Sequence, residues 1–227
     1  MKFFLAPMQG LTGYTVRNAF HHHFDYIDKY YTPFIPAAKR MNAKIKRDID
    51  PVNNDGITLI PQAMSIVADE VIDLHRQLVP YGYDEINVNL GCPSGTVVSK
   101  KRGSGILAYP DMLDSFLDEL YTKADFPVSI KTRVGFNDDE LWPKLIEIYS
   151  KYPISELTVH PRVQKDFYKN TPRMDDFALA MQKINPDKTT LCYNGDITDT
   201  NSFNALTDYF PDIDEIMIGR GLFANPA

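Results

Sequence analysis

Short apolar runs alternate with longer amphipathic stretches along the whole of this 227-residue chain. The short runs end in polar or glycine-rich clusters, which is typical of buried strands. The longer stretches show helical spacing of their apolar residues. Eight strands are predicted, at residues 3–6, 26–31, 58–64, 85–89, 128–133, 156–160, 189–194 and 215–219. Six helices are predicted, at residues 14–23, 69–78, 111–122, 140–152, 175–184 and 201–209, with Thr12, Asp138 and either Asp199 or Thr200 as caps for three of them.

Eight strands with intervening helices favour a closed parallel barrel over an open sheet. The predicted fold is therefore α/β, a (β/α)8 TIM barrel formed as one domain by residues 1–227. The chain is expected to stop before the last barrel helix, because residues 225–227 follow directly after the eighth strand and its turn. Only the stretch after Tyr31 has no clear pattern.

Side-chain parity along the strands gives a second expectation. Successive residues of a strand point to opposite faces, so one face carries aliphatic side chains and the other carries polar ones near the strand ends. We expect the aliphatic face to pack against helices and the polar face to line the upper barrel interior; the alternative is a sheet with one solvated face. The polar set is Asn87, Asn89, Lys131, Arg133, Thr158 and His160, and the aliphatic set is Ile86, Val88, Ile130, Leu157, Val159, Ile216 and Ile218.

Composition narrows the class of protein. A hydrophobic share of 44% suits a large core, and a net charge of −6 leaves any RNA contact to a local basic patch. The two cysteines lie in different settings and form no disulfide framework. No apolar run approaches the roughly 18 residues that span a membrane. A soluble, cytoplasmic, reduced protein is expected, with no membrane and no metal partner.

Cys92 follows a strand and stands between Gly91 and Pro93 in a tight turn. Proline restricts the residue before it to an extended backbone, which sets the direction of the thiol. A thiol is mostly protonated at neutral pH, so it can donate a proton as well as act as a nucleophile. The alternative is a small buried hydrophobe, which is the expected role of Cys192, inside a later strand.

Polar residues at the ends of three further strands predict a ligand site. Lys131 and Arg133 would both enter the barrel, where two cations need an anionic or electron-rich partner; the alternative is an ion pair with a carboxylate of another strand. His160 could donate a hydrogen bond to a cofactor carbonyl, or be a satisfied core histidine. Residues 194–196 (NGD) and 219–221 (GRG) follow the seventh and eighth strands, where these barrels bind phosphate.

Three further charged segments are weaker candidates for a functional site. His21, His22 and His23 would point about 100° apart on a helix and cannot converge on a metal. Basic residues at 39–47 form a solvated surface or touch a nucleic-acid backbone. Residues 100–102 (KKR) follow Cys92 in the same loop, where a basic patch would meet a polyanionic substrate.

Taken together, these clusters resemble the motifs of the tRNA-dihydrouridine synthases, flavin-dependent enzymes that reduce uridine in tRNA. The resemblance covers almost the whole chain. Its Asn-Leu-Gly-Cys-Pro element is specific, whereas the two phosphate elements recur in other flavin barrels. The matching segments are 6–12 (APMQGLT), 89–94 (NLGCPS), 103–105 (GSG), 128–135 (VSIKTRVG), 160–162 (HPR), 194–197 (NGDI) and 217–221 (MIGRG).

The resemblance implies FMN as cofactor, NADPH or NADH as reductant and a single-stranded loop uridine of tRNA as substrate of a monomeric enzyme. Hydride would reach C6 of uracil, and Cys92 would protonate C5. The residues implied for FMN are Pro7, Met8, Gln62, Lys131, His160, Asn194, Gly195, Gly219 and Arg220. Those implied for the substrate are Asn89, Lys131, Arg133, Arg162, Tyr168, Lys100 and Arg102.

The chain departs from the family pattern at Gly13, Pro33-Phe34, Val163 and Asp166. The family also continues into a C-terminal helical domain that grips tRNA, and this chain is expected to end before it. Two rival functions remain open. One is another FMN barrel acting on a free pyrimidine or enone, similar to dihydroorotate dehydrogenase. The other is a catalytically silent flavin- or RNA-binding module.

Overall fold

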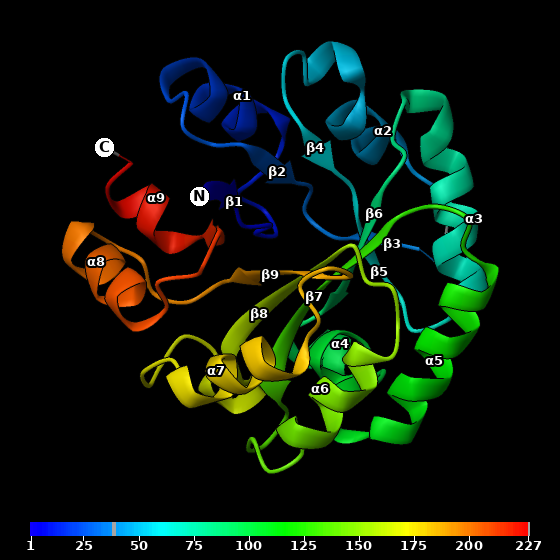
Figure 1. The fold of residues 1–227 in the computed structure, drawn as a ribbon. Coiled ribbons are helices and arrows are strands. Elements are labelled where there is room, and N and C mark those ends of the chain that lie inside the picture. Colours follow the sequence, from blue (N-terminus) through cyan, green and yellow to red (C-terminus); the bar gives the residue numbers. More distant parts are fainter. Residues whose placement is uncertain (38–39, 227) are drawn as a thin grey trace.

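The computed structural model describes residues 1–37 and 40–226 and confirms the alternation of strands and helices. Within these residues all strands are parallel and form one sheet, in the order β3-β5-β6-β7-β8-β9-β10-β1-β2-β4. Helices surround the strands (Figure 1). The strands are β1 (Lys2–Leu5), β2 (Lys29–Tyr31), β3 (Ile35–Pro36), β4 (Leu59–Ile60), β5 (Gln62–Met64), β6 (Ile86–Leu90), β7 (Val128–Gly135), β8 (Glu156–Val163), β9 (Thr190–Tyr193) and β10 (Glu215–Ile218).

The sheet closes on itself at Pro61. Strand β4 pairs with β2, strand β5 pairs with β6, and only Pro61 separates β4 from β5. Proline has no N–H to give to a ladder, but the Pro61 carbonyl still accepts from the Asn87 N–H at 2.9 Å. The predicted barrel is therefore confirmed, and the predicted strand 58–64 is divided into two pieces around this proline.

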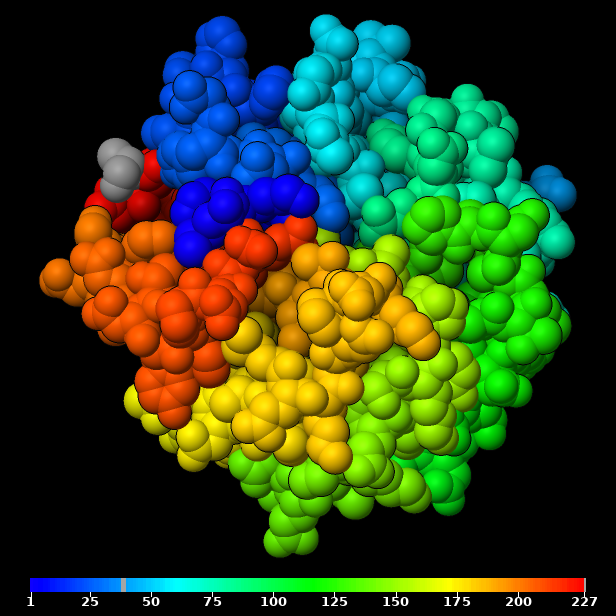
Figure 2. All heavy atoms as spheres, viewed as in Figure 1, coloured from blue at the N-terminus to red at the C-terminus, as the bar shows by residue number. Residues whose placement is uncertain are grey.

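The first and last strands are neighbours in the closed barrel. Strand β1 pairs with β10 from Lys2 opposite Glu215 to Leu5 opposite Ile218. Figure 2 shows the same relation on the surface, where the blue N-terminal segment lies against the orange-red segment near residue 215. Residues far apart in the sequence therefore share one rim of the barrel.

All six predicted helices form, each with ends within two residues of the prediction. The unpatterned stretch after Tyr31 contains β3 and a further helix, and short helices follow β6 and β10. No helix in the described part of the chain has both the length and the apolar character needed to cross a bilayer. The helices are α1 (Tyr14–His23), α2 (Ala43–Ile49), α3 (Ala68–Leu78), α4 (Gly95–Val98), α5 (Pro110–Lys123), α6 (Trp142–Ser150), α7 (Met174–Lys183), α8 (Thr200–Tyr209) and α9 (Arg220–Ala224); 3-10 turns are η1 (Pro51–Asn53), η2 (Val79–Tyr81), η3 (Gly103–Ala108) and η4 (Gln164–Asp166).

One of the three predicted helix caps is confirmed. The Asp199 carboxylate accepts from the Ser202 N–H at 2.8 Å at the start of α8. Thr12 and Asp138 do not cap: α1 and α6 begin after Gly13 and Leu141 without a side-chain cap of their own. The Tyr14 N–H is instead satisfied at 2.7 Å by the carboxylate of Asp48, from the distant α2. A cap supplied across 34 residues leaves no local signal in the sequence.

The parity expectation is confirmed by burial. The aliphatic set belongs to the large core between the sheet and the helices. The opposite face encloses a smaller apolar cluster inside the barrel, so the alternative of a solvated sheet face is wrong. Below it, buried Glu156 accepts from Lys29, Tyr31 and Thr158 at 2.7 to 2.8 Å. The inner cluster consists of Phe4, Ala6, Tyr31, Ile60, Cys192 and Met217.

Candidate active site

A cavity of about 700 Å³ lies where the barrel strands end. Its wall takes residues from the segments that follow β1, β6, β9 and β10 and from within β5, β6, β7 and β8. The sequence-predicted residues on its wall are Pro7, Met8, Gln62, Asn89, Cys92, Lys131, Arg133, His160, Tyr168, Asn194, Gly195, Gly219 and Arg220.

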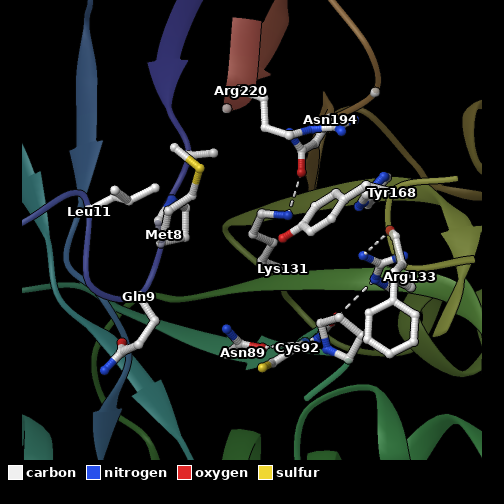
Figure 3. Close-up of a pocket in the computed structure, with 18 of the residues that line it drawn as sticks. Met8, Gln9, Leu11, Asn89, Cys92, Lys131, Arg133, Tyr168, Asn194 and Arg220 are labelled. Carbon is white, nitrogen blue, oxygen red and sulfur yellow. Dashed lines mark hydrogen bonds between the residues drawn. The ribbon is translucent and has the colours of Figure 1, made fainter. Parts of the chain in front are cut away.

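The labelled side chains divide the cavity into two faces and two ends (Figure 3). Met8 and Leu11, from the segment after β1, lie across the cavity from Lys131 and Tyr168. Asn194 and Arg220 lie at one end, and Asn89 and Cys92 at the other. The thiol and the predicted phosphate region are therefore separated by the length of the cavity.

The turn that carries Cys92 is held from both sides. The Asn89 side-chain oxygen accepts from the N–H groups of Gly91 and Cys92, at 3.1 and 2.9 Å. The Cys92 carbonyl accepts from the N–H and the hydroxyl of Ser104, at 3.1 and 2.9 Å. Gly103 has φ +55°, and a Cβ there would lie 2.7 Å from the Cys92 carbonyl oxygen. Only glycine fits, so the Gly-Ser-Gly loop is part of the thiol's support.

The Cys92 thiol is protonated at neutral pH. Burial raises its pKa above the ordinary value, and this outweighs the hydrogen bond from the Ser94 backbone and the charges of Arg133 and Lys131, which lower the pKa. A half-buried thiol of this kind is a poor nucleophile but a competent proton donor.

Arg133 is buried and is held by backbone carbonyls. Its guanidinium donates to the carbonyls of Gly91 (3.0 Å), Val163 (3.0 Å) and Phe167 (2.8 Å). Burial lowers the pKa of Arg133 to about 10, so it stays charged at neutral pH. The guanidinium has five N–H groups, and three are used. The remaining donors and the whole charge are available to the cavity.

Lys131 is half-buried and donates to the side-chain oxygen of Asn194, whose nitrogen in turn donates to the Met217 carbonyl at 2.7 Å. Burial, and then the charge of Arg133, lowers the pKa of Lys131 to about 7. Across residues 1–37 and 40–226 neither Lys131 nor Arg133 forms an ion pair. The alternative of a carboxylate partner from another strand is therefore wrong for the described chain.

His160 is a neutral imidazole with a defined tautomer. Burial, with the charges of Arg133, Lys131 and Arg162, lowers its pKa well below the ordinary value. Its Nε2 lies 3.2 Å from Nη1 of Arg162. Because a guanidinium can only donate, Nε2 accepts and the ring proton sits on Nδ1. His160 therefore keeps one N–H donor.

Arg162 lies behind the cavity wall and not on it. It is 1% exposed and forms a bidentate pair with Asp196, with Nη1 to Oδ1 at 2.9 Å. Arg220 donates to the same carboxylate at 2.9 Å, and its Cζ lies 4.6 Å from the centre of the Tyr168 ring. Burial alone would raise the pKa of Asp196, but the two arginines lower it. The predicted contact of Arg162 with the substrate stays a prediction; in the structure Arg162 contacts His160 and Asp196.

The end of the cavity near Arg220 presents unused backbone donors. In the described structure the N–H groups of Gly195, Asp196, Arg220 and Gly221 donate to no other group of the protein. A Cβ on Gly221 would lie 1.9 Å from the Ile197 carbonyl oxygen, so glycine is needed where the two loops meet. Converging N–H groups beside an arginine fit a phosphate or another anion.

The basic loop after Cys92 lies outside the cavity wall. Arg102 pairs with Glu70 at 3.1 Å, and Nζ of Lys101 lies 4.3 Å from the centre of the Tyr109 ring. Lys100 is exposed. In the basic segment 39–47, Lys39 lies outside the described residues, and the four other basic residues are exposed on or before α2.

Some wall residues were not singled out from the sequence. Gln9 and Leu11 belong to the motif after β1 but have no chemical signature. Phe34 comes from the stretch that shows no pattern, and Phe167 precedes the predicted Tyr168. Asp196 lies inside the predicted phosphate motif, where a carboxylate is counterintuitive. Its role becomes visible only with Arg162 and Arg220 around it.

Comparison with solved structures places the fold among barrel enzymes. Morphinone reductase superposes with a TM-score of 0.64 at 11% identity, covering 99% of this chain and 83% of that one. A 3-hexulose-6-phosphate synthase from Salmonella typhimurium superposes with a TM-score of 0.58 at 14% identity, covering 98% and 90%. At such identities the likeness concerns the fold alone.

Sequence comparison is more specific. The tRNA-dihydrouridine synthase B of Pasteurella multocida (strain Pm70) is 27% identical over 234 residues, 99% of this chain and 67% of the relative. That of Escherichia coli (strain K12) is 32% identical over 158 residues, 69% and 48%. A probable tRNA-dihydrouridine synthase of Staphylococcus aureus (strain Mu50) is 34% identical over 154 residues, 66% and 46%. The matches span about half of the last two relatives. The family model described as dihydrouridine synthase matches residues 4–227, and the chain therefore belongs to the dihydrouridine synthase family.

Proposed function

We propose that this protein reduces uridine in tRNA to 5,6-dihydrouridine, acting as a cytoplasmic monomer. One observation carries the proposal: a protonated thiol and two cations that form no ion pair with a described residue face the same cavity. At the end opposite the thiol, the N–H groups of Gly195, Asp196, Arg220 and Gly221 form an anion cradle. Cys92 supplies the thiol, and Lys131 and Arg133 supply the charges. Family membership supports the same reaction.

The cavity residues fit FMN. The free N–H groups of Gly195, Asp196, Arg220 and Gly221 suit its phosphate. The Nδ1–H of His160 and the ammonium of Lys131 suit electron-rich ring atoms. When bound, FMN would supply hydride for C6 of the uracil ring, with NADPH or NADH as its reductant.

Residues of the protein would then stabilise the negative charge that develops on the substrate and supply the proton. Hydride addition at C6 leaves an enolate with its negative charge on the O4 side of the substrate. Arg133, with its remaining N–H groups, and protonated Lys131 would stabilise that charge in a site shielded from water. The Cys92 thiol would deliver the proton to C5. The thiolate that remains is stabilised by the same two cations, and burial, which raises the pKa of Cys92, favours its reprotonation from solvent.

A uridine must leave any base stacking before it can reach this cavity, so single-stranded loop RNA is the expected substrate. Phe167 and Tyr168 stand at the wall with 46% and 50% of their surface exposed, as stacking platforms for a nucleotide would. Lys100 and Lys101 would contact the RNA backbone near Cys92. The Asn89 side-chain oxygen already accepts two hydrogen bonds, and one N–H of its amide donates to Gln62. The other N–H is left for the base.

One observation favours the rival, a flavin barrel acting on a free pyrimidine. The charge of Arg102 is neutralised by Glu70, so the loop after Cys92 is less basic than its sequence indicates. A competition assay separates the two functions. Free uridine at millimolar concentration should compete with tRNA if the substrate is a small molecule, and should have no effect if the enzyme reads RNA.

The direct test is reconstitution. Purified protein is incubated with FMN, reduced with NADPH or NADH, and mixed anaerobically with tRNA transcribed in vitro. Re-oxidation of the flavin absorbance by tRNA, with dihydrouridine found by mass spectrometry, is the expected result. A protein that cannot bind FMN, or a reduced form that tRNA never re-oxidises, would end the proposal.

Flavin binding should depend on pH through Lys131. Because burial lowers its pKa to about 7, the ammonium is present at pH 6 and largely lost at pH 8.5. An electron-rich ligand favours the charged form, so affinity should fall as pH rises, by about tenfold over this range. Riboflavin, which has no phosphate to titrate, is the probe, and fluorescence quenching is the measurement. Lys131→Met should flatten the profile; equal slopes in both proteins would contradict the assignment.

A further inference from the structure

Four buried polar side chains form a hydrogen-bonded row beneath the Cys92 turn. Asn89 donates to Gln62, Gln62 donates to Asn87, and Asn87 donates to Ser129, at 2.8, 2.8 and 3.0 Å. Gln62, Asn87 and Ser129 are 0% exposed, and Asn89 is 8% exposed. The last three positions are neighbours in the sheet, since Gln62 is the partner of Asn87 and Asn87 is the partner of Ser129.

The direction of the row is set by the backbone at its upper end. The Asn89 oxygen faces two N–H groups, those of Gly91 and Cys92, so its nitrogen must point to Gln62. Gln62 then accepts with its oxygen and donates with its nitrogen, and Asn87 does the same. Reversing one amide would place N–H groups against N–H groups. Each buried group left without a partner costs about 1–3 kcal/mol.

Ser129 gives the row its lower end. Its hydroxyl oxygen accepts from Asn87, which leaves its own proton free to donate. Burial raises the pKa of the Glu85 carboxyl, and the neighbouring Ser129 hydroxyl opposes this rise. The row thus ends at a hydroxyl, which accepts from Asn87 as the polarity set by the two N–H groups at the top requires.

The row rises to the turn that presents the thiol. Without the Asn89 oxygen, the N–H groups of Gly91 and Cys92 have no partner in the described chain. Asn89 is held in this orientation from below by Gln62, which Asn87 holds in turn. Asn87 and Ser129 themselves do not reach the cavity wall.

We propose that Asn87 and Ser129 are positioning residues for proton transfer: they complete the hydrogen-bonded row that holds the Gln62 and Asn89 amides in place, and the Asn89 oxygen then holds the Cys92 turn so that its thiol faces the cavity. The role as proton donor rests on the proposed function. The positional effect on the thiol does not, and it can be measured in the purified chain without cofactor or RNA.

The test is the alkylation rate of Cys92 by iodoacetamide as a function of pH, followed by mass spectrometry in Asn87→Leu and Ser129→Ala. Loosening the turn hydrates the thiol and removes the burial that raises its pKa. The expected result is alkylation at pH 7.5 that is about three- to tenfold faster, since that factor corresponds to half to one pKa unit of thiolate fraction.

Two controls separate positioning from general damage. Cys192 is 0% exposed inside the barrel, so its alkylation reports unfolding within the same sample. Thr132→Val is the matched control: it removes another fully buried hydroxyl of β7, which faces the helices and lies 2.9 Å from the Tyr149 hydroxyl. Thr132→Val should leave the Cys92 rate unchanged, with Cys192 protected in every folded variant.

The inference would be overturned if the Cys92 alkylation rate were unchanged in both Asn87→Leu and Ser129→Ala while Cys192 stayed protected. It would also be overturned if Thr132→Val raised the Cys92 rate by as much as these variants do. If Asn87→Leu exposes Cys192, Ser129→Ala decides alone. In the reconstituted enzyme both variants should lower kcat with KM for tRNA unchanged. If the variants alkylate faster but the wild-type protein reduces no uridine, the positioning role of the row is supported and the proposed function is wrong.

Discussion

Replacing Cys92 with alanine should lower the turnover of the reconstituted enzyme by about 10²- to 10⁴-fold, the usual contribution of a positioned acid. Cys92 shares the cavity wall with Lys131 and Arg133, and burial raises its pKa so that it keeps its proton at neutral pH. Flavin affinity should be unaffected, because Cys92 lies at the opposite end from the anion cradle. Turnover is measured as dihydrouridine formed in tRNA by mass spectrometry.

The pH profile checks the same residue independently. A general acid must be protonated to work, so beyond the fall near pH 7 expected from loss of the Lys131 ammonium, turnover should fall a second time as pH rises through the raised pKa of Cys92. The alanine variant should lose this descending limb. Cys192→Ala is the matched control, because it removes the other thiol, which is buried inside the barrel and is not part of the cavity wall, and should keep turnover near wild type. Full turnover in Cys92→Ala would remove the thiol from the mechanism.

Arg133→Lys should cost about 1–3 kcal/mol of unfolding free energy, because a lysine cannot reach all three carbonyls, of which that of Val163 is buried. The arginine joins the Cys92 turn, through Gly91, to the segment that carries Phe167. Turnover should fall by about 10²-fold or more, since the substituted ammonium no longer sits where charge develops. Urea denaturation and the tRNA assay measure the two effects.

Arg173→Lys provides the matched comparison for this prediction. Arg173 has 29% of its side chain exposed and pairs with Asp139 at 3.0 Å and with Asp166. A lysine can keep such pairs, so the change should cost less than about 1 kcal/mol and spare turnover. Similar losses in both variants would show that the three carbonyl contacts of Arg133 contribute no more than the ion pairs of Arg173, and that Arg133 is not the anchor of the thiol turn.

The sequence predicted the elements well because their signals are local. Side-chain parity along 85–89 and 128–133 is enough to separate the core face from the barrel interior, and burial of Ile86 and Ile130 follows from it. The alternation of strands and helices determined the barrel. The Asn-Leu-Gly-Cys-Pro turn identified its thiol, because a glycine and a proline around a cysteine restrict the backbone whatever the surroundings.

Partners from other strands could not be predicted in this way. Arg162 and Arg102 carry charge in the sequence, yet only the fold shows that Asp196 and Glu70 neutralise them. In the same way, nothing near Tyr14 announces that Asp48 will cap its helix. Such contacts join positions more than 30 residues apart, so their chemistry exists only after the barrel has closed.

The sequence by itself therefore determined the barrel, its polar rim and the thiol at the end of β6, since periodicity and turn chemistry act over a few residues. The tertiary structure alone decided how that thiol is used. It raised the pKa of Cys92 by burial, gave Lys131 and Arg133 no carboxylate partner among the described residues, and aligned Asn87 with its neighbours beneath the turn. Burial and long-range hydrogen bonds exist only in the packed chain, so the pKa and the orientation of these side chains cannot be predicted from the motif alone.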